Sequence, residues 1–198
     1  MSKLYNPCPC GSGKKLKFCC NEFSKMGNFE LLAEEICRKC PVAVCYINKG
    51  WESEGLANMV VVRALPNENY ICGLYLVDLF CLGIKDAGIK MNASADLITE
   101  LLQKAAAGLR EGLEAVDYEL VRSIAFGGDE YAARIGFSPH KDWPKAKLIL
   151  EPDRPFENRV TFGKDGKPLY VNGPYDIGQN KIIRTVLAAG GNFIKQLE

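Results

Sequence analysis

The chain has 198 residues, of which 47% are hydrophobic and 25% are charged. This length fits one domain of ordinary size with a small appendage, and the composition is that of a globular protein rather than a disordered chain. No run of about 18 apolar residues occurs, so the sequence predicts no membrane-spanning helix. The formal net charge of +1 argues against a protein dedicated to binding polyanions.

The charge is distributed unevenly along the chain. The first 25 residues hold five lysines and one acidic residue, Glu22, whereas the remaining 173 residues hold 20 basic and 23 acidic residues. A short basic head therefore precedes a slightly acidic body. The N-terminus shows no apolar core followed by a small-residue cleavage site, so we expect no signal peptide and a cytoplasmic protein.

Cysteine is the most informative residue type, with nine copies in the chain. The cytosol keeps thiols reduced, so clustered cysteines there indicate metal binding or catalysis rather than disulfides. Four of them, Cys8, Cys10, Cys19 and Cys20, lie within thirteen residues of the head. Four thiolates suit a closed tetrahedral Zn²⁺ site with Zn–S distances of about 2.3 Å. The alternatives are unrelated buried thiols or another thiolate-bound metal, such as an iron–sulfur centre.

The chain between the two cysteine pairs must fold back sharply. Glycines at positions 11 and 13 supply the positive φ angles that such a turn needs. We expect the closed turn to present Lys14, Lys15 and Lys17 outward and to hold Leu16 and Phe18 inside. A segment this short cannot bury enough surface to fold alone, so the ion would supply most of its folding free energy.

Residues 6–20 resemble the SEC-C motif, the zinc-binding tail of the bacterial translocation ATPase SecA that also occurs on other bacterial proteins. The pattern of that family, Cys-x-Cys-Gly-Ser-Gly-Lys-Lys followed by aromatic and basic residues and a final Cys-His or Cys-Cys, is matched by Cys8, Cys10, Gly11, Ser12, Gly13, Lys14, Lys15, Cys19 and Cys20. Leu16 departs from it, because the family often has an aromatic residue there, and Phe18 is the nearest substitute.

The resemblance implies a recognition device rather than a catalyst. Zinc modules of SecA-like proteins contact the export chaperone SecB, and related modules are associated with ribosomes. The three lysines at positions 14, 15 and 17 would then face an acidic protein surface or, as a further option, RNA phosphate. Four cysteine ligands leave no coordination position for a reacting water, so the zinc would be structural.

The sequence predicts a linker or helix junction at residues 21–28 and a helix at residues 29–40. Cys37 and Cys40 form a Cys-x-x-Cys pair, and Cys45, Cys72 and Cys81 follow. A second metal site and a redox pair are both conceivable, but we favour buried structural thiols, because free cysteine behaves as a small hydrophobic residue.

The strongest strand signals are residues 57–65 and 70–78, which predict a hairpin around the turn at 66–69. Both runs are almost continuously apolar, so we expect at least part of the sheet to be covered on both faces. Residues 80–88 read as an exit loop that is broken by Gly83 and Gly88.

Helical periodicity returns at Ser94, a predicted N-cap, with Glu100 and Lys104 as an i,i+4 pair. The remaining elements are predicted as a helix at 114–126 ended by Gly127 and Gly128, a short helix at 129–135, an ambiguous segment at 142–151, a hairpin of 159–162 with 168–171, and a last helix at 177–189. This mixed order predicts an α+β protein, with a small N-terminal zinc knot at residues 1–25 and a helix and antiparallel-sheet domain at residues 26–198.

Few residues of the body point to chemistry. Asp78, Lys85 and Asp86 near a sheet end could hold magnesium and activate water, although hydrogen bonding of Asp78 to the loop backbone is the simpler interpretation. The single histidine, His140, has no nucleophile beside it, so we favour a structural or surface role. No small-molecule ligand is identified. We therefore expect a zinc-binding interaction protein, with a metal-dependent hydrolase or nuclease as the alternative.

Overall fold

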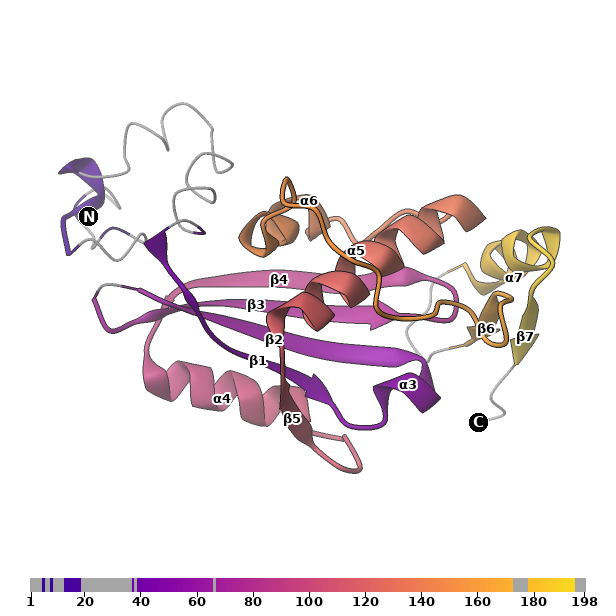
Figure 1. The fold of residues 1–198 in the computed structure, drawn as a ribbon, viewed down its shortest axis with the longest axis horizontal. Helices are drawn as coiled ribbons and strands as arrows, with labels where there is room; N and C mark the ends of the chain where they lie inside the picture. Colours follow the sequence, from indigo (N-terminus) through magenta and orange to yellow (C-terminus); the bar gives the residue numbers. More distant parts are fainter. Residues whose placement is uncertain are drawn as a thin grey trace.

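The computed structural model describes residues 5, 8, 13–18, 37, 39–65, 67–172 and 178–194. A five-stranded antiparallel sheet lies at its centre, with the strand order β4-β3-β2-β1-β5 (Figure 1). The strands are β1 (Val42–Asn48), β2 (Leu56–Ala64), β3 (Tyr70–Asp78), β4 (Gly83–Ala93) and β5 (Leu113–Val116). Helices accompany this antiparallel sheet, which agrees with the predicted α+β class.

The central hairpin is formed by β2 and β3, as the sequence predicts. Its register runs without interruption from the pair Leu56–Asp78 to the pair Ala64–Tyr70. Three successive residues of β2, Val60, Val61 and Val62, are no more than 2% exposed. Since successive side chains of a strand point to opposite faces, both faces of the sheet are covered here. The expectation of two-sided burial is confirmed.

Helix α4 (Ala95–Ala106) covers one face of the sheet (Figure 1). Its N-cap is Ser94, whose hydroxyl accepts a hydrogen bond from the Leu97 N–H, and Lys104 Nζ lies 2.6 Å from Glu100 Oε1. Both contacts were predicted. The helix packs Ile98 against Val60 and Val62 in one apolar cluster.

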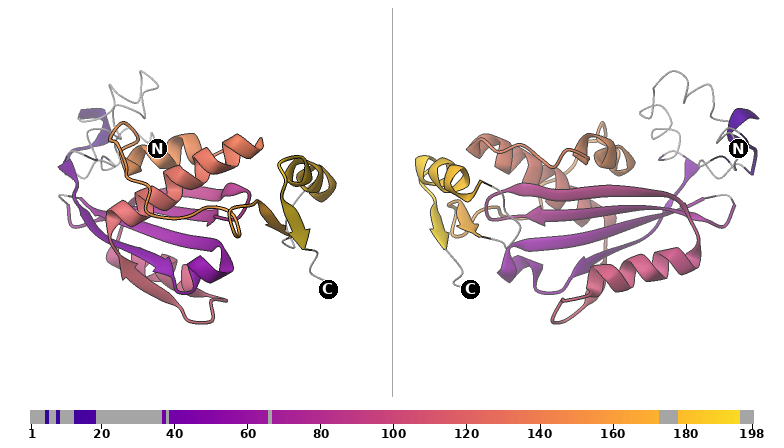
Figure 2. Two further views of the ribbon diagram at one scale, coloured as in Figure 1. Left: turned by 45° about the vertical axis from the view of Figure 1, so that its right-hand side comes forward. Right: turned by 180° about the vertical axis from the view of Figure 1, so that it is seen from behind.

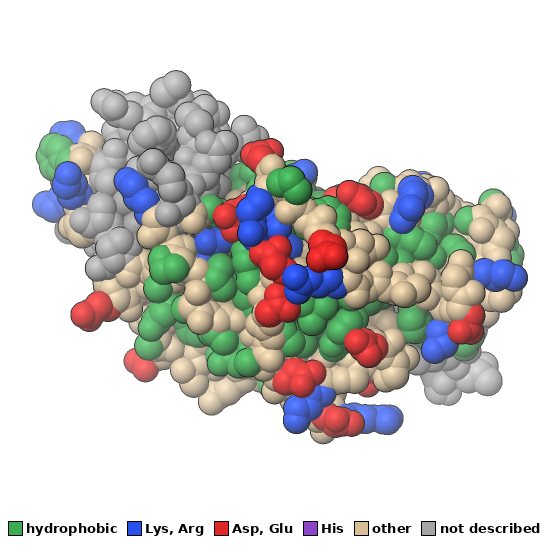
Figure 3. Space-filling model, viewed as in Figure 1, with side chains coloured by type: hydrophobic (Ala, Val, Ile, Leu, Met, Phe, Trp, Pro, Cys, Tyr) green, Lys and Arg blue, Asp and Glu red, His purple; other side chains and the backbone are tan. Residues whose placement is uncertain are grey.

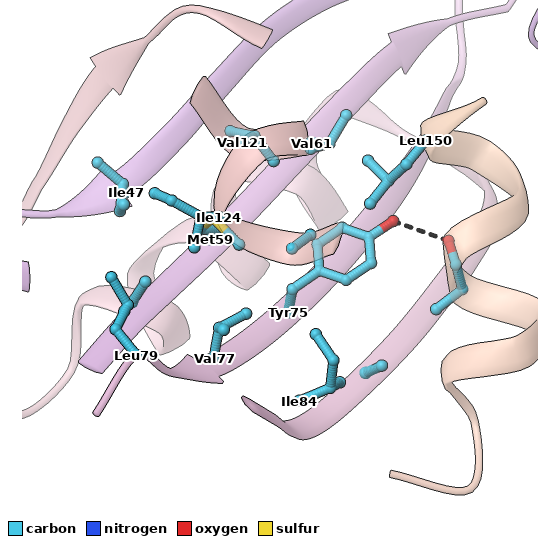
Figure 4. Close-up of a cluster of buried hydrophobic side chains, with 14 of the residues drawn as sticks. Ile47, Met59, Val61, Tyr75, Val77, Leu79, Ile84, Val121, Ile124 and Leu150 are labelled. Atoms are coloured by element: carbon cyan, nitrogen blue, oxygen red, sulfur yellow. Dashed lines mark hydrogen bonds between the residues drawn. The ribbon is translucent and has the colours of Figure 1, made fainter. Parts of the chain in front are cut away.

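The opposite face is covered by helix α5 (Tyr118–Ile135), helix α6 (Trp143–Ala146) and the 3-10 turn η3 (Lys147–Leu150). Figure 4 shows the core under them, where the Tyr75 hydroxyl donates to the Ala146 carbonyl over 2.9 Å. Residues 143–150 are thus helical, which resolves the ambiguity of this segment. Buried Trp143 anchors α6, because its indole N–H donates to Asp129 Oδ2 at 2.6 Å.

The predicted exit loop at residues 80–88 is wrong. Only residues 79–82 form a turn, and the chain returns at once as the eleven-residue strand β4, paired with β3. Gly83 starts this strand with φ +64°, and a Cβ there would lie 2.6 Å from the Gly128 carbonyl oxygen. Gly83 therefore marks a close approach of β4 to helix α5 rather than a break in the sheet.

The two helices predicted at 114–126 and 129–135 form one helix, α5. It begins later than predicted, after the N-cap Asp117, because residues 113–116 pair with β1 as the edge strand β5. It also runs through Gly127 and Gly128 to a left-handed C-cap at Gly136. A Cβ on Gly127 would meet the Phe162 ring at 2.7 Å, and one on Gly128 would meet Val77 Cγ1 at 2.7 Å. The glycines allow close packing, and the burial they permit outweighs their poor helix propensity.

The predicted hairpin at 159–171 is only partly confirmed. Asp165 and Gly166, with φ 51° and 76°, form the expected tight turn between Lys164 and Lys167. Residues 159–162 are not a strand, however. Strand β6 (Leu169–Val171) instead pairs in parallel with β7 (Asn192–Ile194), and helix α7 (Gln179–Ala188) connects the two as the predicted last helix.

These C-terminal elements lie at the end of the sheet opposite residues 13–18 (Figures 1 and 2). A helical turn of four residues, α3 (Trp51–Glu54), links β1 to β2. The linker predicted at 21–28 and most of the helix predicted at 29–40 lie outside the described residues, although Cys37 and Lys39 have helical backbone. Within the part of the chain that the structure describes, no helix is long and apolar enough to cross a membrane.

The glycine pair of α5 gives a direct test of this packing. Gly128→Ala should destabilise the protein by about 1–3 kcal/mol, because the new methyl group meets the buried side chain of Val77. Glu130→Ala, at an exposed position of the same helix, is the matched control and should leave stability within about 0.5 kcal/mol. Urea denaturation measures both. A Gly128→Ala variant as stable as the control would contradict the packing.

Candidate metal centre

The N-terminal chain folds back on itself at the first predicted ligand. Cys8 is 1% exposed, and its N–H donates to the Lys14 carbonyl over 2.8 Å. Gly13, with φ +72°, makes the turn that this hydrogen bond closes. The need for a left-handed glycine at position 13 is therefore confirmed, while Gly11 lies outside the described residues.

A short 3-10 turn, η2 (Leu16–Phe18), follows the closed loop. The predicted exposure of Lys14, Lys15 and Lys17 is confirmed. Phe18, by contrast, is 64% exposed, so its predicted inward position is wrong. Successive residues of a 3-10 helix project about 120° apart, which lets a single turn expose both Lys17 and Phe18. The Lys17 ammonium lies 5.6 Å from the centre of the Phe18 ring.

Tyr5 belongs to the same exposed group, although no sequence pattern singled it out. Its hydroxyl accepts a hydrogen bond from Lys17 Nζ over 3.1 Å, and the ammonium groups of Lys15 and Lys17 lie 5.7 and 5.2 Å from its ring centre. Basic and apolar side chains are exposed together at this end of the molecule (upper left in Figure 3). The loop thus presents two cations around an exposed aromatic ring.

Cys8 is the one predicted ligand that the structure describes, since Cys10, Cys19 and Cys20 lie outside the described residues. A shielded thiol in a loop closed by its own backbone fits a thiolate ligand of a soft or borderline ion. No group of three or more cysteine, histidine or acidic side chains with metal-binding geometry occurs among the described residues. The chemistry of the four sulfur donors therefore stands on the sequence pattern together with the fold of residues 8 and 13–18.

Comparison with known proteins decides what this pattern is. The family pattern described as the SEC-C motif matches residues 6–22. This chain carries a SEC-C motif. The match includes all four cysteines and all three lysines, and it supports metal binding by this segment. No curated protein and no solved structure matches the chain.

Asp78 is the most deeply buried acid among the candidates of the body. It ends β3, is 9% exposed, and its Oδ1 accepts hydrogen bonds from the N–H groups of Phe80 and Cys81 at 2.9 Å each. Burial raises the pKa of this carboxyl to about 6, against the lowering effect of Lys85 and the backbone donors. The simpler interpretation of Asp78, as a cap of the turn at 79–82, is thus the one that the geometry favours.

Lys85 and Asp86 do not join Asp78 in a cluster of two acids and a lysine. Asp78 and Lys85 line a hollow of about 260 Å³ beside β6, whereas Asp86 is absent from its lining. The exposed Asp86 carboxylate instead lies 3.6 Å from His140 Nδ1. His140 is itself fixed by its backbone, whose N–H donates to the Ile84 carbonyl at 2.9 Å. The geometry therefore favours structural roles for these residues over a magnesium site.

Four of the five cysteines of the body are buried, and Cys37 is partly buried. None of the six described cysteines forms a disulfide. Burial raises the pKa of the Cys45 and Cys72 thiols to about 12 in each case, and that of Cys37 rises for the same reason. Cys40 and Cys81 are 2% and 0% exposed. Because thiolate is the metal-binding and redox-active form, raised pKa values favour structural thiols, as predicted.

Two buried arginines are the main feature that sequence reasoning missed. Arg63, on β2, donates to the carbonyls of Ile149 and Cys40 at 3.0 and 2.9 Å, to the Tyr118 hydroxyl at 2.7 Å and to Glu151 Oε2 at 2.9 Å. Arg63 thereby connects the sheet to α5, to η3 and to the segment at Cys40 that precedes β1. An arginine within an apolar strand is the sequence signal, because burial demands that all its donors be satisfied.

Arg122, on α5, is fully buried and holds the irregular segment after η3. Its guanidinium donates to the carbonyls of Leu150, Glu151 and Pro155 at 2.9, 3.0 and 3.0 Å, and it forms an ion pair with Glu119 at 3.0 Å. Backbone carbonyls of a loop thus replace water around a buried charge, and the loop is held in one conformation.

Substitution of Asp78 separates a structural role from a catalytic one. In the folded protein its pKa is about 6, above the ordinary 3.8, so the folded state keeps a proton that the unfolded state loses between these pH values. The contribution of Asp78 to stability should therefore decline as the pH rises from about 4 to about 6. Asp78→Asn keeps an oxygen acceptor without the charge, so its stability should not show this decline. Its free energy of unfolding relative to wild type should therefore rise by on the order of 2–3 kcal/mol as the pH increases from about 4 to about 7.

Asp78→Ala is the companion variant, because it removes the acceptor and leaves two buried N–H groups unsatisfied. It should lower stability by about 1–3 kcal/mol per orphaned group at either pH. Chemical denaturation of the three proteins at the two pH values measures both effects. An Asp78→Ala variant with the same free energy of unfolding as wild type would contradict the capping role.

Proposed function

We propose that the SEC-C motif of this chain is a zinc-stabilised docking module that attaches the body to an acidic protein surface. Cys8, Cys10, Cys19 and Cys20 would hold the ion. Bound zinc would supply a closed tetrahedral centre that gives a short segment a fixed shape. The observation that carries the proposal is the exposed lysine group on a loop closed around Cys8, within residues that match the family pattern.

The exposed residues of this loop would form the contact face of the proposed module. Lys15 and Lys17 flank the ring of Tyr5, which is 52% exposed, and Phe18 lies beside them. Interfaces place aromatic anchors at the centre and charged groups around them, and charge complementarity selects the partner. Lys14 extends the positive charge of this face. The surface therefore suits a partner with acidic side chains around an apolar contact.

The resemblance to SecA-type modules indicates two kinds of partner, an export chaperone such as SecB or the ribosome. A protein surface is the primary candidate, and ribosomal RNA is the alternative, since exposed aromatic rings and lysines are also suited to nucleic acid. A metal-dependent hydrolase remains a weaker alternative, because Asp78, Lys85 and Asp86 do not converge on one site.

Replacing the described ligand tests the metal. Wild-type protein should carry about one zinc ion per chain, and Cys8→Ser should lose most of it while the body stays folded, because none of the described motif residues belongs to the core cluster of the sheet. Cys37→Ser, outside the motif, is the control and should retain zinc. Elemental analysis after gel filtration measures the metal and circular dichroism the fold. Zinc in Cys8→Ser at the wild-type level would contradict the ligand set.

Charge reversal tests the docking face without disturbing the metal. Replacing Lys14, Lys15 and Lys17 by Glu should weaken binding to purified SecB or purified ribosomes by at least about tenfold, because attraction becomes repulsion. The zinc content should be unchanged. The matched control reverses the exposed body lysines Lys49, Lys141 and Lys167, with the same change in net charge. Equal binding by both triple variants would rule out the docking face.

The salt dependence of the same interaction distinguishes protein from RNA. Binding to single-stranded RNA through three lysine–phosphate contacts should give a slope of log K against log salt of about −2. A partner surface of mixed apolar and acidic character should give a shallower slope. Biolayer interferometry at several salt concentrations measures it, with poly-uridine as the RNA probe.

A further inference from the structure

Strand β4 forms one edge of the five-stranded sheet and is the longest of the described strands, with eleven residues. An uncovered edge strand is a template for another strand, and proteins usually shorten, twist or charge such edges. The main-chain groups and side chains along this edge, residues 86–90, decide what fits beside it.

Alternate residues of β4 point their main-chain groups away from the sheet. Within antiparallel strands, successive residues bond to opposite neighbours. Leu79 N–H donates to the Gly55 carbonyl at the end of the β2–β3 ladder, so odd-numbered residues of β3 bond to β2 and even-numbered ones to β4. Gly88 is paired with an even-numbered β3 residue and therefore bonds inward. Ala87 and Ile89, on either side of it, direct N–H and C=O groups outward.

The edge is covered at one end. There the Ile84 carbonyl accepts the His140 N–H at 2.9 Å. Further along, the Asp86 carboxylate accepts the Ala87 N–H at 2.8 Å, a local bond within the strand. Across the ranges that the structure describes, no residue bonds to the outward main-chain groups of Ile89. The open stretch thus begins after Lys85.

The sequence of this stretch, Asp86-Ala87-Gly88-Ile89-Lys90, is complementary to itself in an antiparallel register centred on Gly88. Ala87 of each strand then faces Ile89 of the other, and each such pair exchanges two main-chain hydrogen bonds. Asp86 faces Lys90 of the other strand in a non-hydrogen-bonded pair, in which the two side chains lie close together and opposite charges stabilise the sheet. Both side chains are exposed, Asp86 by 71%.

The centre of this register is free of steric conflict. Gly88 brings no side chain to the centre, and a Cβ built on it would have no atom within 4 Å, so the face of the sheet is open where the two glycines would meet. A groove of about 350 Å³ runs alongside, between Gly88, Ile89 and Met91 of β4 and Lys145 and Ala146 of α6. It borders the apolar side of the edge, where Ala87 and Ile89 of an added strand would lie.

We propose that this edge binds a second copy of the chain, so that two sheets join through antiparallel pairing of residues 86–90 around a two-fold axis at Gly88. The charge complementarity of Asp86 and Lys90 selects the second copy over an unrelated strand. On pairing, the Ala87 N–H passes from the Asp86 carboxylate to the Ile89 carbonyl of the second copy. Asp86 is thereby released to pair with Lys90 across the interface.

The test reverses the two charges singly and together. Asp86→Lys places lysine opposite Lys90, and Lys90→Asp places aspartate opposite Asp86, so each variant alone should raise the dimer dissociation constant by about tenfold or more. The double variant Asp86→Lys/Lys90→Asp restores both pairs and should dimerise like wild type. A mixture of the two single variants should form heterodimers. Analytical ultracentrifugation of the full chain over a concentration series measures each case.

Controls separate pairing from folding. Glu130→Lys changes an exposed charge of α5 by the same amount and should not alter the association. The Ile89 amide should exchange hydrogen more slowly as the protein concentration rises, because its N–H becomes bonded only in the dimer. A wild-type chain that stays monomeric at the highest soluble concentration would overturn the proposal. So would a dimer that neither single variant weakens, or rapid Ile89 exchange in the dimer.

Discussion

The body of this protein depends on one constraint, which is that both faces of its central sheet are apolar and must be covered. Val60, Val61 and Val62 are buried in succession, so a layer of helix is required on each side. Helix α4 supplies one layer, and α5, α6 and η3 supply the other (Figure 1). The glycine pair in α5 follows from the same constraint, since it brings the helix close enough to fill the space over β3 and β4.

The second layer is partly irregular, and the two buried arginines hold it. Arg63 and Arg122 direct their guanidinium donors to the carbonyls of residues 149–155, where a regular element would have satisfied them internally. Truncation of Arg122 would leave several of these carbonyls without this partner in a dry environment. The described residues of the N-terminal segment expose Tyr5 and Phe18 rather than bury them. The proposed metal would supply folding free energy to a segment of that size.

Much of the fold could be predicted from local patterns. The β2–β3 hairpin, the Ser94 cap and the Asp165-Gly166 turn all follow from signals that lie within a few residues. The errors share a cause in contacts distant in sequence. Gly83 and Gly127 look like breaks until their neighbours across the core are known, and residues 114–116 look helical until β1 is placed beside them. Arg63 and Arg122 could not be assigned roles, because their partners lie up to 88 and 33 residues away, respectively.

For the motif at residues 6–22, the local sequence alone is informative and no distant contact is needed. Its cysteine spacing predicts its chemistry, because the donors and the turn glycines lie within one short segment. The most direct test of that chemistry is the absorption spectrum of the cobalt-substituted protein. Four thiolate ligands predict an intense sulfur-to-cobalt charge-transfer band together with visible bands of tetrahedral geometry. A spectrum with oxygen or nitrogen donors, or no cobalt binding, would contradict the account.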